Sequence, residues 1–325
     1  MSTKQYSIIV FVIVICTLIS FYSGYFFKGS NKDDNTITDT DNTKTVPYFK
    51  DEIILITKDK PHYTLIAQAS RSFKTDALFS HRQKVFFFDG KEWQSKASNI
   101  TSGKSDIEKT AVIPSWEIKD DPSFVLRQSV KGSILINNNK IEFDVPELNN
   151  EIGIRSLVDY TLFRSESRGK LVIDGKEYES YVLYSRTYSQ ATSISLVEVS
   201  DPLGINTDWV AFWDLNGNFY NIDKTTVDDN YKGDYKSHTI AVYKDSDEKV
   251  QKSFTVDIQK KTDNGYQIKM LEKINSYLDV YFLNTVNKNI TSSPYNWKTG
   301  QIEGSIRLDN GKVIKGIGIY EQLYQ

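Results

Sequence analysis

The chain has 325 residues, which is long enough for one large hydrophobic core or two modest ones. Its 40 basic and 42 acidic residues nearly cancel and are mixed along the chain, which excludes the basic surface expected of a nucleic-acid-binding protein. The single cysteine, Cys16, lies in an apolar N-terminal run, so the rest of the chain has no disulfide, thiol nucleophile or cysteine-based metal site.

An uncharged stretch, Tyr6–Phe27, follows the first five residues. At about 1.5 Å per residue, a helix over this stretch would cross a hydrocarbon core of roughly 30 Å. A cleaved signal peptide is the alternative, although the stretch is longer than the usual signal-peptide core and ends in bulky residues. We therefore expect a single transmembrane signal anchor over residues 6–27 at the cell membrane. Residues 1–5 would lie in the cytoplasm and the C-terminal domain would be extracytoplasmic.

The segment after the anchor divides into a linker and two modules. Residues 28–45 are polar and acidic without apolar periodicity, which predicts a flexible linker. The polar segment Glu147–Glu151 indicates a boundary, so we expect a first β-barrel-like module over 46–150 and a second over 151–325. A single continuous sandwich is the alternative.

The composition of these modules predicts an all-β fold. The chain has 20 Tyr, 17 Phe and 5 Trp, and aromatic and β-branched residues favour pleated sheet. No segment keeps helical spacing for more than three turns, and only Asp263–Ser276 is ambiguous. Strands are expected in Glu52–Thr57, Tyr63–Ser70, Lys84–Phe88, Phe124–Ile136, Asp159–Phe163, Tyr178–Tyr188, Ser193–Val199, Asp208–Leu215, His238–Tyr243, Lys252–Ile258, Tyr277–Leu283, Gln301–Leu308 and Val313–Tyr320.

Five Asp-Gly or Asn-Gly pairs separate these apolar runs. Such pairs supply positive φ and favour two-residue hairpin loops, so they predict an antiparallel meander that closes into a barrel or packs as a sandwich. The pairs are Asp89-Gly90, Asp174-Gly175, Asn216-Gly217, Asn264-Gly265 and Asn310-Gly311.

The segment Asp208–Asp214 is the first candidate for ligand binding. Side chains alternate along a strand, so Trp209, Ala211 and Trp213 should share one face. Two neighbouring indoles can form the wall of a pocket for an apolar or flat ligand. The alternative is that they fill a core between sheets.

The segment Tyr181–Ser189 is the second candidate. It should place Tyr184, Arg186 and Tyr188 on one face, where they could stack on a ligand or hydrogen-bond to it. The alternative is a solvent-facing strand with a cross-strand partner for Arg186.

Motifs for metals, phosphates and nucleophilic catalysis are absent from the sequence. It contains no phosphate loop, no nucleophile elbow and no zinc-protease motif. The three histidines, His62, His81 and His238, are far apart, and we interpret each as a surface or strand residue. We therefore expect no metal site and no cofactor.

The order of several motifs resembles the lipocalin-like carotenoid 1,2-hydratase/AttH-like family. The resemblance covers about residues 155–325, and the order and spacing of its short motifs carry it. The matching segments are Asp159–Phe163, Gly169–Tyr178, Tyr184–Ser189, Asp208–Gly217 and the closing stretch Trp297–Tyr324.

This resemblance implies two lipocalin-like β-barrel modules that meet around a hydrophobic ligand site. The family pattern has an acidic residue in one strand where this chain has Ser185, Thr187 and Tyr188. A hydroxyl group cannot replace a carboxyl group in proton transfer to a carbon–carbon double bond. The resemblance therefore supports the fold and the pocket more than a hydratase activity.

Three functional hypotheses follow. The leading one is a membrane-anchored extracytoplasmic protein that binds an apolar ligand, either a lipid or an isoprenoid. The first alternative is a hydratase or hydrolase acting on such a ligand, with Asp208 and Asp214 as candidate acid or base and Glu321 in a structural position. The second alternative is an envelope or cell-surface module for protein interactions.

Overall fold

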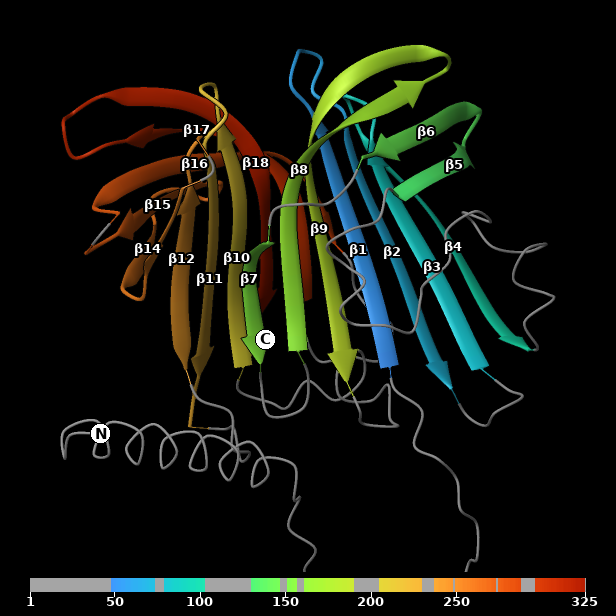
Figure 1. The fold of residues 1–325 in the computed structure, drawn as a ribbon, viewed down its shortest axis with the longest axis horizontal. Helices are drawn as coiled ribbons and strands as arrows, with labels where there is room; N and C mark the ends of the chain where they lie inside the picture. Colours follow the sequence, from blue (N-terminus) through green and yellow to red (C-terminus); the bar gives the residue numbers. More distant parts are fainter. Residues whose placement is uncertain are drawn as a thin grey trace, which may run out of the picture. The chain divides into compact units, whose positions relative to one another are not determined.

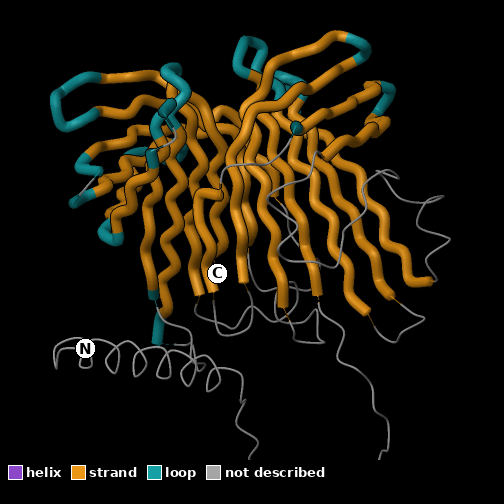
Figure 2. Tube along the Cα trace, viewed as in Figure 1, coloured by secondary structure: helices purple, strands orange, loops and turns teal. Residues whose placement is uncertain are grey.

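Strands account for all the regular structure that the computed structural model describes, so the predicted all-β class is confirmed (Figure 2). Within the described residues there is no helix of the length and apolarity needed to cross a membrane. The predicted anchor over 6–27 and the linker over 28–45 lie outside these residues. The described ranges are 48–73, 79–102, 130–146, 151–156, 161–189, 205–229, 237–247, 249–272, 274–287 and 296–324.

The first sheet contains nine antiparallel strands in the order β4-β3-β2-β1-β9-β8-β6-β5, with β7 also paired to β8. Figure 1 shows β8, β9 and β1 to β4 side by side. The edge strands β4 and β5 contact each other, and Lys96 Nζ donates to the Leu135 carbonyl at 3.1 Å, so the sheet is nearly closed. Its strands are β1 Tyr48–Thr57, β2 Thr64–Phe73, β3 Phe79–Phe88, β4 Trp93–Ser102, β5 Val130–Ile136, β6 Asn139–Val145, β7 Glu151–Ser156, β8 Thr161–Ile173 and β9 Lys176–Ser189.

The second sheet also contains nine antiparallel strands, in the order β13-β12-β11-β10-β18-β17-β16-β15-β14. Strands β12 and β14 contact each other, and Ser253 Oγ donates to the Leu271 carbonyl at 2.6 Å, so this sheet is nearly closed as well. Its strands are β10 Ile205–Asp214, β11 Phe219–Val227, β12 His238–Lys244, β13 Val250–Ser253, β14 Val256–Lys260, β15 Gly265–Met270, β16 Ser276–Asn287, β17 Asn296–Arg307 and β18 Val313–Tyr324.

The first sheet ends with β9 at Ser189, and the second begins with β10 at Ile205. The sequence instead predicts a boundary between residues 150 and 151. The reason is the pairing of β9, which lies beside β1 at the start of the first sheet. Strands β7, β8 and β9 therefore belong with the N-terminal strands. The predicted boundary therefore lies between β6, which ends at Val145, and β7, which begins at Glu151, and both strands belong to the first sheet.

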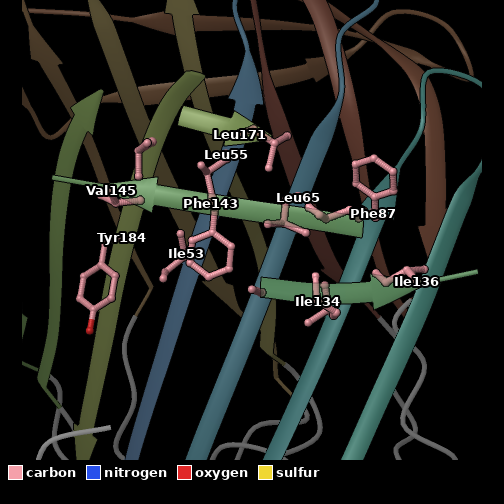
Figure 3. Packing of buried hydrophobic residues seen from close by; sticks show 14 of the residues in the cluster. Ile53, Leu55, Leu65, Phe87, Ile134, Ile136, Phe143, Val145, Leu171 and Tyr184 are labelled. Carbon is pink, nitrogen blue, oxygen red and sulfur yellow. The ribbon is translucent and has the colours of Figure 1, made fainter. Parts of the chain in front are cut away.

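Alternating side chains divide the buried residues into three clusters. One fills the interior of the first sheet and includes Ile53, Leu65 and Phe143 (Figure 3). A second fills the interior of the second sheet, with Val210 and Phe212 among its members. The third joins outward-facing residues of both sheets, so the sheets pack against each other through an apolar layer.

The predicted positions of the hairpin connections are confirmed, because all five Asx-Gly pairs lie where consecutive antiparallel strands connect, but the predicted two-residue length holds for one of the five. Only Asp174-Gly175 forms a two-residue loop, with φ values of 50° and 84°. The loop Asn137-Asn138 has the same length and positive φ at both residues, but it contains no glycine. Asparagine tolerates this conformation better than most residues, which explains why a search for Asx-Gly pairs misses the loop.

Candidate functional site

Strand β10 presents different surfaces to the two sides of its sheet. Trp209, Ala211 and Trp213 belong to the cluster between the sheets, whereas Val210 and Phe212 belong to the interior of the second sheet. The predicted sharing of one face by the two tryptophans is therefore confirmed. Their face is covered by the first sheet.

Trp213 is enclosed on all sides and has no exposed surface. Its ring stacks on Tyr181 of β9, with centroids 5.4 Å apart, and it also contacts Phe219 at 4.8 Å. The indole Nε1 donates to Glu166 Oε1 at 3.1 Å. Trp213 thus links the two sheets through both its ring and its nitrogen.

Glu166 is a buried carboxylate at the same contact between the sheets. Besides Trp213, it accepts hydrogen bonds from Lys244 Nζ at 2.8 Å and from Arg168 Nη1. The side chains of Glu166 and Lys244 are 5% and 8% exposed, so this ion pair is shielded from water. A buried charge pair of this kind is stable only while every partner is present.

A second polar group surrounds Trp209, four residues earlier on β10. The indole Nε1 donates to Asn221 Oδ1 at 2.9 Å, and the Arg164 guanidinium lies 5.0 Å from the ring centroid. Arg164 Nη1 also lies 3.3 Å from Asp223 Oδ2, and His238 Nε2 lies 3.5 Å from Asp223 Oδ1. A carboxylate that is 4% exposed therefore lies between a guanidinium and an imidazole.

The register continues this polar group across the first sheet. Arg164 lies opposite Ser185, and the next residues in the same row are Glu52, Gln68 and Lys84. These side chains share the face of Ile54, Ile66 and Phe86, which pack in the layer between the sheets, and they are half-buried. We call this row, Arg164–Ser185–Glu52–Gln68–Lys84, the polar row.

The wall of the second sheet that faces the polar row also contains polar and charged residues. Thr299, Glu321, Trp209 and Asp223 follow one another across β17, β18, β10 and β11. A region between two packed sheets is expected to be apolar, because burying charged groups is costly. The polar row and this wall are therefore the best candidate for a functional site.

The candidate residues Tyr184 and Arg186 lie elsewhere, in the interior of the first sheet. Arg186 binds Asp51 of β1 through Nε–Oδ1 and Nη2–Oδ2 contacts of 2.6 and 2.7 Å. The predicted cross-strand partner thus exists, but both side chains are buried. Burial, followed by the Asp51 carboxylate, raises the pKa of the Tyr184 hydroxyl. Figure 3 shows this ring beside the apolar cluster.

Tyr188 occupies the β9 position opposite Phe49, and its side chain is outside the described part of the structure. The predicted ligand-binding residues are consequently divided between two places. Trp209 and Trp213 lie between the sheets, and Tyr184 and Arg186 lie inside the first sheet.

The candidate acids Asp208 and Asp214 do not join the polar row. Asp208 accepts hydrogen bonds from Tyr320 Oη at 2.6 Å and Gln322 Nε2 at 3.0 Å, on the side of β10 that carries Val210 and Phe212. Burial, followed by the charge of Asp208, raises the pKa of Tyr320. Asp214 accepts hydrogen bonds from the backbone N–H groups of Asn216 and Asn218, so it stabilises the β10–β11 turn.

Sequence reasoning missed the charged residues between the sheets. The sequence Arg164-Ser165-Glu166-Ser167-Arg168 alternates charged and small residues, which is typical of a strand with one face in water. Nothing in this pattern indicates that a second sheet covers the charged face. Within the described residues, no group of three or more His, Cys, Asp or Glu side chains is arranged to hold a metal ion.

Comparison with solved structures supports the resemblance found in the sequence. The putative AttH NE1406 from Nitrosomonas europaea is similar with a TM-score of 0.52 and 10% identity, covering 85% of this chain and 91% of that one. The chain has an AttH-like fold. CghA, in a crystal structure with Sch210972, is similar with a TM-score of 0.50 and 8% identity, covering 86% and 88%. No family model and no curated protein matches the sequence.

Proposed function

We propose that this protein binds an apolar ligand, a lipid or an isoprenoid, between its two sheets. The observation that carries the proposal is the polar row and its facing wall, which place charged and amide groups beside Trp209 in a region that packing alone would make apolar. An apolar site with a few polar groups is the usual composition of a small-molecule site.

The two tryptophans would have different roles in this site. Trp213 is stacked and hydrogen-bonded between the sheets, so it fixes their contact. Trp209 lies next to the polar row and contacts Arg164, so its ring is the surface against which the ligand would lie. CghA was crystallised with Sch210972, which makes ligand binding the first function to test for this fold.

The membrane location is part of the same proposal. The stretch Tyr6–Phe27 would act as a single-pass anchor that holds the β domain outside the cytoplasm, close to a source of apolar ligands. The membrane and the ligand are the expected partners. Protease treatment of intact cells tests this location, because only an extracytoplasmic domain would be cleaved.

Native mass spectrometry of the whole chain, extracted from its own membranes, tests ligand binding. We expect the wild type to carry an adduct of lipid or isoprenoid mass and Trp209→Leu to lose it. Phe212→Leu is the matched control, since it lies on the same strand with its side chain inside the second sheet, and it should keep the adduct. A wild type without an adduct, or equal adducts in both variants, would contradict the proposal.

A second candidate function is hydration or hydrolysis of the bound ligand. Asp223, His238 and Arg164 favour it. The buried carboxylate can take a proton from water as the water oxygen adds to the substrate, and the imidazole beside it can give a proton to the other carbon of a double bond or to the leaving group. We expect incorporation of ¹⁸O from labelled water into the ligand by the wild type and its loss in Asp223→Asn. No incorporation by the wild type would rule out this reaction and leave ligand binding as the function. Unchanged incorporation in Asp223→Asn would show that Asp223 does not take the proton.

A further inference from the structure

Two side chains of β17 are fully buried without a hydrogen-bond partner in the described part of the chain. Thr299 and Gln301 have no exposed surface. The hydroxyl Oγ1 of Thr299 and both Oε1 and Nε2 of Gln301 are unpartnered. Burying a polar group without a partner is costly, so a folded chain retains such a group only for a reason outside the apolar packing.

The register places both side chains on the wall that faces the first sheet. Gln301 lies beside Ile319, which packs in the layer between the sheets, and Thr299 lies beside Glu321. Glu321 is next to Trp209 on β10. Neighbouring strands are about 4.8 Å apart, so Thr299 is about 10 Å from Trp209 across the sheet. This distance suits a ligand whose apolar body lies on Trp209 and whose polar end lies at β17.

The chemistry of the two side chains defines this polar end. The Gln301 carboxamide presents an acceptor and a donor side by side, and the Thr299 hydroxyl can act as either. Their registered neighbours on the adjacent strands are Ile319, Asn284, Glu321 and Val286, and Glu321 is the one charged residue among these four. The cations of the polar row, Arg164 and Lys84, lie on the other sheet. A carboxylate would meet the like charge of Glu321, so an uncharged group is favoured.

We infer that Thr299 and Gln301 bind the head group of the ligand, and that this head group is an uncharged carboxamide. The inference rests on the proposed function, because it assigns the polar end of the same ligand. A carboxamide matches Gln301 through two hydrogen bonds, one donated and one accepted, and leaves its oxygen or nitrogen able to reach Thr299. The expected ligand is therefore an amphiphile with an apolar chain and a primary amide.

Three probes of equal chain length test this assignment on the whole chain: oleamide, oleate and a C18 alkene. We expect the wild type to bind oleamide at least tenfold more tightly than the other two. Gln301→Met should lose this preference while still binding the alkene, and Thr299→Val should weaken it. The melting temperature of Gln301→Met should equal or exceed that of the wild type, because an unpartnered buried amide is removed.

Gln83 provides the matched control. It is equally buried, it has an interaction partner, and it lies on the side of β3 that faces the interior of the first sheet. Gln83→Met should therefore lower the melting temperature and keep the preference for oleamide.

The outcomes separate this inference from the proposed function. The head-group assignment is wrong if the alkene binds but oleamide is not preferred, or if Gln301→Met keeps the preference. A buried water or an empty space would then account for the missing hydrogen-bond partner of Gln301. A clear fall in the melting temperature of Gln301→Met would show a structural partner and overturn the assignment as well. If the wild type binds none of the three probes, both the assignment and the proposed site fail.

Discussion

Two buried polar groups, one inside the first sheet and one on β17, differ in whether they have a partner. Inside the first sheet, Asp51 and Arg186 satisfy each other through two short contacts. Inside the second sheet, the half-buried Asp208 accepts hydrogen bonds from Tyr320 and Gln322. In the layer between the sheets, Glu166 is likewise satisfied by Lys244, Arg168 and Trp213. Gln301 of β17, by contrast, has no hydrogen-bond partner in the described structure although it is fully buried.

This difference separates groups that stabilise the fold from groups that are available to a ligand. A complete buried ion pair favours one arrangement of the side chains around it. When one member of the pair is removed, the other remains as a buried charge without compensation. An unsatisfied buried amide contributes nothing to stability, so its removal should cost nothing. Mutations of satisfied buried groups should therefore act on folding, and mutations of Thr299 and Gln301 should act on binding.

The largest effect is expected for the ion pair inside the first sheet. Arg186→Met should lower the free energy of unfolding by about 3–5 kcal/mol, because Asp51 remains as a buried carboxylate without its cation. Urea denaturation of the variant and the wild type measures this loss. The double variant Asp51→Leu, Arg186→Met should regain most of it. A loss below about 1 kcal/mol in the single variant would contradict the comparison.

Glu166 should give a smaller loss, because it holds charged partners at the contact between the sheets. Glu166→Gln keeps the shape of the side chain but weakens its contacts to Lys244, Arg168 and Trp213, so we expect a loss of about 1.5–3 kcal/mol. Glu179→Gln is the control, since Glu179 forms an exposed pair with Lys58 and should show no measurable change. Equal effects of the two substitutions would contradict the role of Glu166.

The smallest expected effect is a loss of stability at alkaline pH, where buried tyrosines ionise. Burial raises the pKa of Tyr184 and Tyr320 above the unfolded value of about 10. Their contribution to stability is therefore complete below pH 10 and decreases as the pH rises between the unfolded and the folded pKa. In that range, each tyrosine should lower the free energy of unfolding by about 1.4 kcal/mol per pH unit.

Urea midpoints from pH 8 to 11 measure this decrease. Tyr320→Phe should have a shallower pH dependence than the wild type, at the cost of a lower stability at pH 8, where its hydrogen bond to Asp208 is missing. Tyr324→Phe, at an exposed position, should leave the slope unchanged. An unchanged slope in Tyr320→Phe would mean that Tyr320 does not titrate above the unfolded value.

The sequence predicts which residues share one face of a strand better than it predicts which other strands cover that face. Alternation correctly puts Trp209 and Trp213 together, because period 2 is a property of one strand. It cannot show that Arg164 and Glu166 meet Asp223 and Lys244, since these contacts join strands from different sheets. For the same reason His238 looks like an ordinary strand residue until β12 is placed beside Asp223.

The module boundary was harder to predict than the strand class. A polar segment in a sequence can indicate a boundary, but strand pairing decides which sheet the following strands join. Strand β9 pairs with β1 from the start of the first sheet, and this long-range contact leaves no local signal. The Asx-Gly pairs succeeded because a turn depends on its own residues alone.

The position of β1 has a mechanical consequence. Tension applied through the residues before Tyr48 acts along a strand that is hydrogen-bonded on one side to β2 and on the other to β9. The two ladders are loaded parallel to the strand, so their hydrogen bonds share the force instead of opening one after another from an edge. The last strand, β18, lies in the same way between β10 and β17. Tension on either terminal strand of the described structure would therefore act on hydrogen bonds along both of its sides.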